Sequence, residues 1–376
     1  MAGIYIHIPW CRNVCIYCDF HFSVSMRNRL ELTDCMVKEL KLQESFLDRE
    51  IIDTIYFGGG TPSVLNDQEL SKILSVIFSL FVVSNDVEIT LEANPDDLSI
   101  SYLRDLRKLG VNRLSLGIQS FFDDDLQWMN RRHDKNQAVR CIKDSKKAGF
   151  NNINIDLIYG LPTLNSLKWK ENLNIAFKNK IQHLSAYHLT LEAKTVYAHK
   201  IKMGRMKEPD ENKGIEHFEM LMEISHKQGF IQYEISNFCL PGFISRHNTS
   251  YWQQKRYLGI GPSANSFNGY SRQWNIRNNT QYIKLIKENT IPCNFENLGV
   301  NEKYNEYILT SLRTMWGADV SLIERKFGLE FYDFFIKEAK KLIFSGKLKR
   351  EGSYFKLTTS GKLFADGIIS QLFMVD

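Results

Sequence analysis

The sequence predicts an α/β fold, a complete or partial barrel of parallel strands followed by a smaller C-terminal helical, winged-helix-like domain. Strand-like and helix-like runs alternate through the first 235 residues. Repeated strand–helix units favour a parallel sheet with right-handed crossovers. From residue 301 onward, a helical segment precedes a short hairpin pattern and a last helix, as in a winged-helix unit. We therefore expect a core at 1–235, an irregular extension at 236–300 rich in Gly, Pro and Asn, and a C-terminal domain at 301–376.

The elements of the core follow from hydrophobic periodicity and from the Gly residues that end helices. The expected strands are Ile4–Ile8, Ile52–Phe57, Val87–Leu91, Arg113–Ile118, Ile153–Leu157, His183–Leu189 and Ile231–Ile235. The expected helices include Arg27–Ser45, Asp67–Phe81, Ser99–Leu109, Asn136–Ala148 and Asn212–Gln228.

The composition is that of an ordinary globular protein, 43% hydrophobic and 24% charged. A net charge of +5 suits anionic small ligands but is too weak to indicate nucleic-acid binding. The N-terminal residues show no targeting pattern, and the longest apolar run is too short to span a bilayer. We expect a cytoplasmic protein that does not bind nucleic acid.

Three of the seven cysteines lie close together, in the pattern Cys11-x3-Cys15-x2-Cys18. In a reducing compartment such a group indicates a metal site. Three thiolates leave one iron of a [4Fe–4S] cluster open, and that iron can chelate S-adenosylmethionine. The alternative is a structural zinc site completed by His21, but no second pair of ligands follows along the chain.

Polar residues follow successive expected strands at their carboxyl ends. The cysteine loop follows the first strand, and Gly58-Gly59-Gly60-Thr61-Pro62-Ser63 follows the second. Glu92, Gln119 and Asp156 end the next three. Ligands of parallel α/β folds bind at this edge, and glycines let the backbone approach a ligand. The sequence therefore predicts one site shared by these strand ends.

Several motifs resemble the coproporphyrinogen-dehydrogenase-like branch of the radical SAM superfamily. They are YIHIPWCRNVCIYCDF at 5–20, GGGTPS at 58–63, SLGIQSF at 115–121 and DLIYGLP at 156–162. The resemblance implies a partial radical-SAM (β/α) barrel in which Cys11, Cys15 and Cys18 hold the cluster. It also implies that S-adenosylmethionine contacts Tyr5, Tyr17, Gly59, Gly60, Thr61, Glu92, Gln119, Arg131 and Asp156.

Within that branch the chain resembles the HemW-type haem chaperones. The dehydrogenases carry a fourth cysteine where this chain has Phe20, and they have a longer N-terminal extension. The haem-linked motif of the chaperones matches His247-Asn248-x-x-Tyr251-Trp252. The resemblance implies that these four residues bind haem, with imidazole as an axial ligand and the aromatic rings as flat apolar surface. Asn265 stands where relatives commonly carry His, which leaves a second axial ligand open.

We therefore expect a haem chaperone that binds a [4Fe–4S] cluster, S-adenosylmethionine and haem. Its expected partners are haem, a haem-acceptor protein and an electron donor, while peripheral membrane contact and a homodimer stay open. The alternative is an enzyme, an oxygen-independent coproporphyrinogen III dehydrogenase that decarboxylates propionates by radical chemistry. Nucleic-acid binding by the C-terminal domain is the third and weakest alternative.

Overall fold

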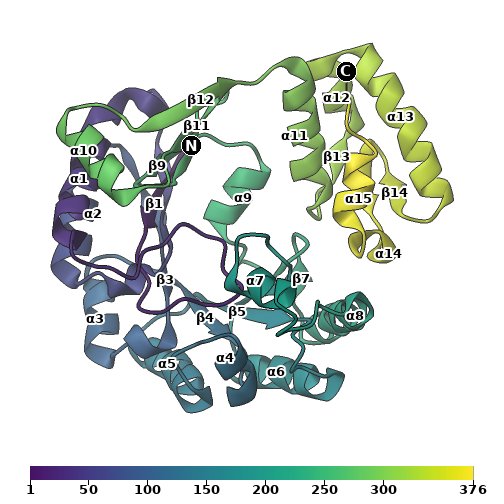
Figure 1. The fold of residues 1–376 in the computed structure, drawn as a ribbon. Helices are drawn as coiled ribbons and strands as arrows, with labels where there is room; N and C mark the ends of the chain where they lie inside the picture. Colours follow the sequence, from purple (N-terminus) through teal and green to yellow (C-terminus); the bar gives the residue numbers. More distant parts are fainter. Residues whose placement is uncertain (376) are drawn as a thin grey trace.

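A curved mixed sheet forms the centre of the molecule and carries its helices on the outside (Figure 1). The structure is a computed structural model that describes residues 1–375, so the last residue of the expected C-terminal domain lies outside it. Neighbouring parallel strands follow the order β9-β1-β2-β3-β4-β5-β6. Their bounds are β1 Ala2–Ile8, β2 Ile52–Gly59, β3 Val83–Ala93, β4 Arg113–Gln119, β5 Ile153–Tyr159, β6 His183–His188 and β9 Tyr257–Ile260. The predicted α/β class with a partial barrel is confirmed.

Short antiparallel strands continue the sheet at both edges. On one side β8 (Asn237–Cys239) pairs with β6, and β7 (Ile231–Gln232) pairs with β8. On the other side β10 (Asn265–Phe267), β11 (Ser271–Asn275) and β12 (Cys293–Asn297) follow β9. The sheet is therefore open, and its edges do not close on each other.

Two parts of this region differ from the expectation. Only two residues of the expected strand Ile231–Ile235 are extended, and they pair antiparallel. The segment 236–300, expected to be irregular, supplies β9, which lies parallel to β1 inside the sheet. The turns between its short strands include Gly261 and Gly269 at positive φ, and these breaks hide the strand periodicity.

Helices surround the parallel strands on their outer side (Figure 1). They are α1 Arg29–Leu42, α2 Asp67–Leu80, α3 Ile100–Lys108, α4 Asp123–Trp128, α5 Lys135–Lys147, α6 Ser166–Lys178 and α8 Glu211–Lys227. Further helices are α7 Val196–Lys202, α9 Arg246–Trp252 and α10 Asn279–Lys287, with 3-10 turns at Glu44–Leu47, Pro62–Val64 and Pro95–Asp97.

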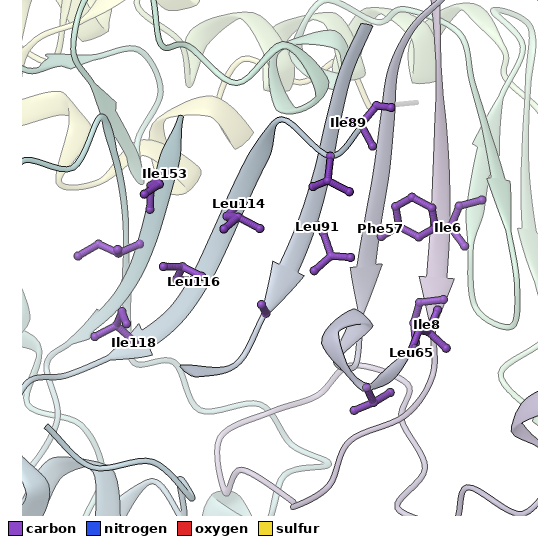
Figure 2. Close-up of a cluster of buried hydrophobic side chains, with 14 of the residues drawn as sticks. Ile6, Ile8, Phe57, Leu65, Ile89, Leu91, Leu114, Leu116, Ile118 and Ile153 are labelled. Carbon is purple, nitrogen blue, oxygen red and sulfur yellow. The ribbon is translucent and has the colours of Figure 1, made fainter. Parts of the chain in front are cut away.

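The two faces of each parallel strand differ in chemistry. The helix-facing layer is apolar and includes Ile6, Phe57, Leu91, Leu114 and Ile153 (Figure 2). The alternate residues face the inside of the curved sheet and are polar. Hydrogen bonds join them across strands, from Tyr56 Oη to Glu92 Oε1 at 2.7 Å, from Asn154 Nδ2 to Ser115 Oγ at 2.7 Å and from Ser185 Oγ to Asn237 Oδ1 at 2.7 Å.

Helix α9 packs inside the curve against the polar face. The Glu88 carboxylate of β3 accepts hydrogen bonds from the backbone N–H groups of Arg246 and His247, at 3.2 and 3.1 Å. An acidic group at a helix N-terminus is favourable because unsatisfied N–H groups point toward it. His247 then contacts Thr54 of β2, well before the carboxyl end of that strand. The helix therefore lies toward the amino ends of the strands.

The C-terminal residues build a second unit with its own core. Its elements are α11 Val300–Leu312, β13 Ala318–Asp319, α12 Val320–Phe327, α13 Leu329–Phe344, β14 Leu348–Glu351, β15 Tyr354–Leu357, α14 Thr359–Lys362 and α15 Ala365–Ser370. Their buried apolar side chains form a cluster separate from that of the large sheet. Figure 1 shows this unit beside the sheet. Within residues 1–375, no helix has the length and apolar character needed to cross a membrane.

A buried carboxyl group holds the 236–300 segment against α1. Glu39 of α1 is fully buried and accepts hydrogen bonds from the Gly261 N–H at 2.8 Å, from Asn275 Nδ2 at 2.7 Å and from Tyr282 Oη. Burial raises the pKa of Glu39 to about 7, against the effect of these donors. One side chain thus fixes a turn, a strand and a helix.

We predict that Glu39→Ala lowers the free energy of unfolding by about 3 kcal/mol or more, because several buried donors lose their acceptor. Chemical denaturation followed by circular dichroism measures the change. Glu31→Ala on the same helix is the control, because Glu31 forms a solvent-exposed ion pair with Lys287 and exposed pairs contribute little. Equal stability of the two variants would contradict the assignment.

Candidate functional site

The cysteine loop connects β1 to α1 and is fixed by backbone hydrogen bonds. The Cys11 N–H donates to Ser23 O at 3.1 Å, which joins the two arms of the loop. Within the loop, the Ile16 N–H donates to Met129 O at 3.3 Å, and Ile16 O accepts from the Tyr197 N–H at 2.8 Å. The loop is therefore held at the carboxyl ends of the strands by contacts with two distant parts of the core.

Two of the three thiols accept hydrogen bonds from the strand-end region. Thr61 Oγ1 donates to Cys11 Sγ at 3.4 Å, and Arg131 Nη1 donates to Cys15 Sγ at 3.5 Å. Burial raises the pKa of Cys18 to about 12, and the nearby Cys15 and Cys11 add to the rise. A bound metal cation lowers the pKa of such thiols, because metal ligation favours the thiolate form.

The loop does not form a ready-made site for a single metal ion within the described residues. Across residues 1–375, no three His, Cys, Asp or Glu side chains are placed to hold one metal ion. Each thiolate of a cubane cluster binds a different iron, so the sulfurs need not converge on one point. The proposed zinc ligand His21 instead hydrogen-bonds through Nε2 to Asn279 Oδ1 at 2.8 Å.

The glycine run brings the end of β2 against the start of the cysteine loop. Gly60 N–H donates to Ile8 O at 2.8 Å. A Cβ atom on Gly60 would lie 2.7 Å from Trp10 O and 3.0 Å from Trp10 N, closer than atoms of a folded protein tolerate. Gly59 has φ 109°, which favours glycine. These positions need glycine for loop packing, beside any contact with a ligand.

A cavity of about 1080 Å³ lies in front of the loop. Eleven of the twelve residues expected to contact the cluster or S-adenosylmethionine line it: Cys11, Cys15, Tyr17, Cys18, Gly59, Gly60, Thr61, Glu92, Gln119, Arg131 and Asp156. The exception is Tyr5, whose ring stacks on Tyr56 at 6.1 Å and whose hydroxyl lies 3.2 Å from His7 Nδ1. The fold thus gathers these strand-end residues around one space.

Two carboxyl groups in the cavity titrate near neutral pH. Burial raises the pKa of Glu92 to about 7, and the neighbouring Asp156 adds to the rise, although Tyr56 donates a hydrogen bond to Glu92. Burial also raises the pKa of Asp156 to about 6, against the hydrogen bond from Asn154 Nδ2 at 2.7 Å. Small changes in pH therefore decide whether these groups carry charge.

Polar atoms without a partner also lie beside this space. Gln119 has φ 65°, a strained backbone that is typical of functional sites, and its Oε1 atom is buried without a hydrogen bond. Arg131 Nε is buried without a partner too, while Arg131 Nη2 donates to Asn94 Oδ1 at 2.6 Å. Buried polar atoms normally have partners, so the site fits a ligand that supplies donors and acceptors.

The expected haem residues lie elsewhere. None of His247, Asn248, Tyr251 and Trp252 lines the cavity. His247 is 1% exposed, with Nδ1 2.7 Å from Thr54 Oγ1 and Nε2 2.8 Å from Tyr251 Oη. Burial, followed by the charge of Arg113, lowers its pKa to about 3. With both ring nitrogens hydrogen-bonded, this imidazole has no free lone pair for iron in this conformation.

The other members of the motif also make internal contacts. Tyr251 packs edge-on against Tyr257 at 4.7 Å. The indole of Trp252 lies under the guanidinium of Arg313, 5.2 Å from its carbon. Asn248 donates its backbone N–H to Ser245 Oγ at 3.3 Å. The motif therefore forms a helix that is built into the fold, and the rings of Tyr251 and Trp252 are half-buried.

Charged and polar residues near the motif also lie outside the cavity. Arg246 pairs with Asp86 at 3.2 Å, and Arg256 pairs with Asp48 at 3.1 Å. Asn265 is exposed in β10, and Cys239 is a buried thiol of β8. None of these four residues lines the cavity.

The sequence did not point to the far wall of the cavity. That wall includes Arg277, between β11 and α10, and residues of the C-terminal unit, among them Arg313, Lys362, Phe364 and Asp366. They lie in separate short segments without a motif, so only the packing of the C-terminal unit brings them to the site. Asn94 was missed as well, although it directly follows the strand that ends near Glu92.

Comparisons with known proteins agree with this geometry. The Radical SAM superfamily description matches residues 5–174, and the HemN C-terminal domain description matches residues 299–364. The chain is 33% identical to "Heme chaperone HemW" of Bacillus subtilis, with 98% of both chains covered. It is 34% identical to the protein of that name from Lactococcus lactis, with 99% of this chain and 97% of the relative covered.

One solved structure shares the whole fold. The coproporphyrinogen III oxidase HemN from Escherichia coli superposes with a TM-score of 0.86 at 22% identity, covering 99% of this chain and 90% of that one. At this identity the likeness concerns the fold alone. Together with the full-length relatives, these matches show that the chain belongs to the family of HemW-type haem chaperones within the radical SAM superfamily.

Proposed function

We propose that this protein is a haem chaperone that carries a [4Fe–4S] cluster and S-adenosylmethionine and passes haem to an acceptor protein. The full-length similarity to HemW-type chaperones is the observation that carries the proposal. The cavity supports it, because three thiols and the polar strand ends line one space of about 1080 Å³.

Cys11, Cys15 and Cys18 would hold the cluster, and Thr61 and Arg131 would steady the thiolates by hydrogen bonds. The ribose and amino-acid groups of S-adenosylmethionine would form hydrogen bonds with Glu92, Gln119 and Asp156. The two carboxylates would accept hydrogen bonds, and the Gln119 amide can donate and accept them. When bound, the pair supplies one-electron chemistry at the sulfonium group. The protein's own task is to orient the ligand and exclude water.

The deciding experiment distinguishes a haem chaperone from a coproporphyrinogen III dehydrogenase. Anaerobically reconstituted protein is titrated with haem, mixed with an apo-haem protein, and separately assayed with coproporphyrinogen III and a reductant. We expect stoichiometric haem binding, transfer to the apo-protein and no vinyl product. Vinyl product without haem transfer would replace the proposal by the dehydrogenase.

We predict that Gly60→Ala lowers the iron and sulfide content after reconstitution, because the new methyl group displaces the start of the cysteine loop. Analysis of iron and acid-labile sulfide provides the measurement. Gly367→Ala is the control, since a Cβ at that position meets nothing within 4 Å. Full cluster content in Gly60→Ala would contradict the role given to this close approach.

We predict that binding of S-adenosylmethionine weakens as the pH falls from about 8 to about 5.5, a range that brackets the two raised carboxyl pKa values. Each carboxyl group must be ionised to accept hydrogen bonds fully, and burial raises the pKa of Glu92 to about 7 and that of Asp156 to about 6. Protonation therefore removes the acceptor as the pH drops. Calorimetric titration across this range measures the effect, and Glu92→Gln should bind more weakly with a flatter pH dependence. An unchanged pH profile in that variant would argue against Glu92 as a contact.

The role of His247 is tested by haem titration of His247→Gln. Because both ring nitrogens contact protein groups, we expect the Soret maximum and the electron paramagnetic resonance of bound haem to stay as in the wild type. A modest loss of affinity is expected, since α9 loses one of its anchors. A changed ligation spectrum would instead support the sequence-based expectation that His247 binds the iron.

A further inference from the structure

The motif helix α9 and the cavity do not share a residue, but one side chain touches both. Arg313 follows the last residue of α11 and lines the cavity. Its guanidinium carbon lies 5.2 Å from the centre of the Trp252 ring. Trp252 itself does not line the cavity. Arg313 therefore connects Trp252 of the motif with the space in front of the thiols.

The backbone around Arg313 is fixed to the core. Thr314 forms an isolated antiparallel bridge with Glu234, and the Met315 N–H donates to Tyr233 O at 2.9 Å. These contacts tie the end of α11 to the segment between β7 and β8. The guanidinium is thus presented from a rigid position, which recognition of a shaped ligand requires.

The hydrogen-bonding capacity of Arg313 is mostly unused. Its Nε atom is buried without a partner. Its only ion pair among the described residues is with Asp366, from Nη1 to Oδ1 at 3.2 Å, and the Asp366 side chain is 87% exposed. Because water surrounds the Asp366 carboxylate, this pair contributes little free energy. A ligand carboxylate can therefore replace Asp366 without breaking a buried interaction.

The buried acid near Arg313 has other partners. Glu234 accepts hydrogen bonds from the Ser236 N–H at 2.8 Å and from Asn237 Nδ2 at 2.5 Å. Burial raises the pKa of Glu234, while these donors and the charge of Arg313 act against the rise. Glu234 is thus satisfied within the segment that carries it, and the guanidinium keeps donors for a ligand.

We infer that Arg313 recognises a propionate carboxylate of haem in the cavity and that Trp252 of the motif is a positioning residue for it. This inference rests on the proposed haem binding and names the carboxylate contact. A guanidinium stacked on an indole is held by cation–π attraction while its edge stays free. That edge can bind a carboxylate through two parallel N–H donors.

The test compares haem with haem dimethyl ester, which has the same ring and iron but no carboxylates. For Arg313→Gln we expect at least about tenfold weaker binding of haem and about unchanged binding of the ester, because charge-assisted hydrogen bonds are lost. Arg313→Lys should recover part of the haem affinity. Asp366→Asn should bind haem more tightly than the wild type, since the competing acid is gone.

Variants of Trp252 test whether this residue affects haem binding only by positioning Arg313. Trp252→Leu should weaken haem binding about threefold to tenfold, as expected for a lost cation–π contact, and Trp252→Phe should weaken it less. Combined with Arg313→Gln, Trp252→Leu should add no further loss. Arg350→Gln is the matched control, because Arg350 also stacks on an aromatic ring, Phe355, but does not line the cavity.

Thermal melts and cluster content identify variants that have merely lost their fold. An equal loss of haem and ester binding in folded Arg313→Gln would overturn the carboxylate contact. Additive losses in the double variant would overturn the positioning role of Trp252. A wild type that binds neither compound would refute the proposed function itself, whereas normal haem binding in Arg313→Gln would refute only this inference.

Discussion

The two-faced character of the parallel strands is the constraint on which the structure depends. Residues that alternate along a strand point to opposite sides, and here one side is apolar and the other polar. The apolar side, part of which Figure 2 shows, is buried in the main core and supplies its hydrophobic free energy. The polar side can then be reserved for the inside of an open, curved sheet.

A polar interior is tolerated only where its groups find partners. Toward the amino ends of the strands, α9 provides them, with His247 between Thr54 and Tyr251. Toward the carboxyl ends, the side chains of Glu92 and Asp156 face the cavity, and Gln119 Oε1 lacks a partner. The polar groups of this layer thus have protein partners at one end of the sheet, whereas at the other end they face the cavity. The motif helix and the strand ends thus lie at opposite ends of the same polar layer.

Much of the candidate site was predictable because it follows from strand order. The carboxyl ends of parallel strands lie at the same edge of a sheet. Glu92, Gln119 and Asp156 each end such a strand, so the sequence could place them together. The cysteine spacing located the loop, and the glycine run located its neighbour. The helix-facing periodicity likewise gave strand and helix positions close to those of the structure.

The remainder depended on contacts between segments that are distant in the sequence. The pairing of β9 with β1 has no local signal, since a four-residue strand that ends at the turn of Gly261 has little periodicity. Placing His247 among haem ligands relied on resemblance, whereas its burial depends on packing against β2 and β3. A role for Arg313 could not be predicted from the sequence. Its position between Trp252 and the cavity depends on how the C-terminal unit packs against the core.

Anomalous X-ray diffraction at the iron edge, from crystals of the reconstituted protein loaded with haem, tests the central claim most directly. The account predicts a compact group of iron peaks within bonding distance of Cys11, Cys15 and Cys18. It also predicts one separate iron peak inside the cavity, in a porphyrin with a carboxylate at Arg313. An iron peak bonded to His247, or a single metal peak shared by the three thiols, would contradict it.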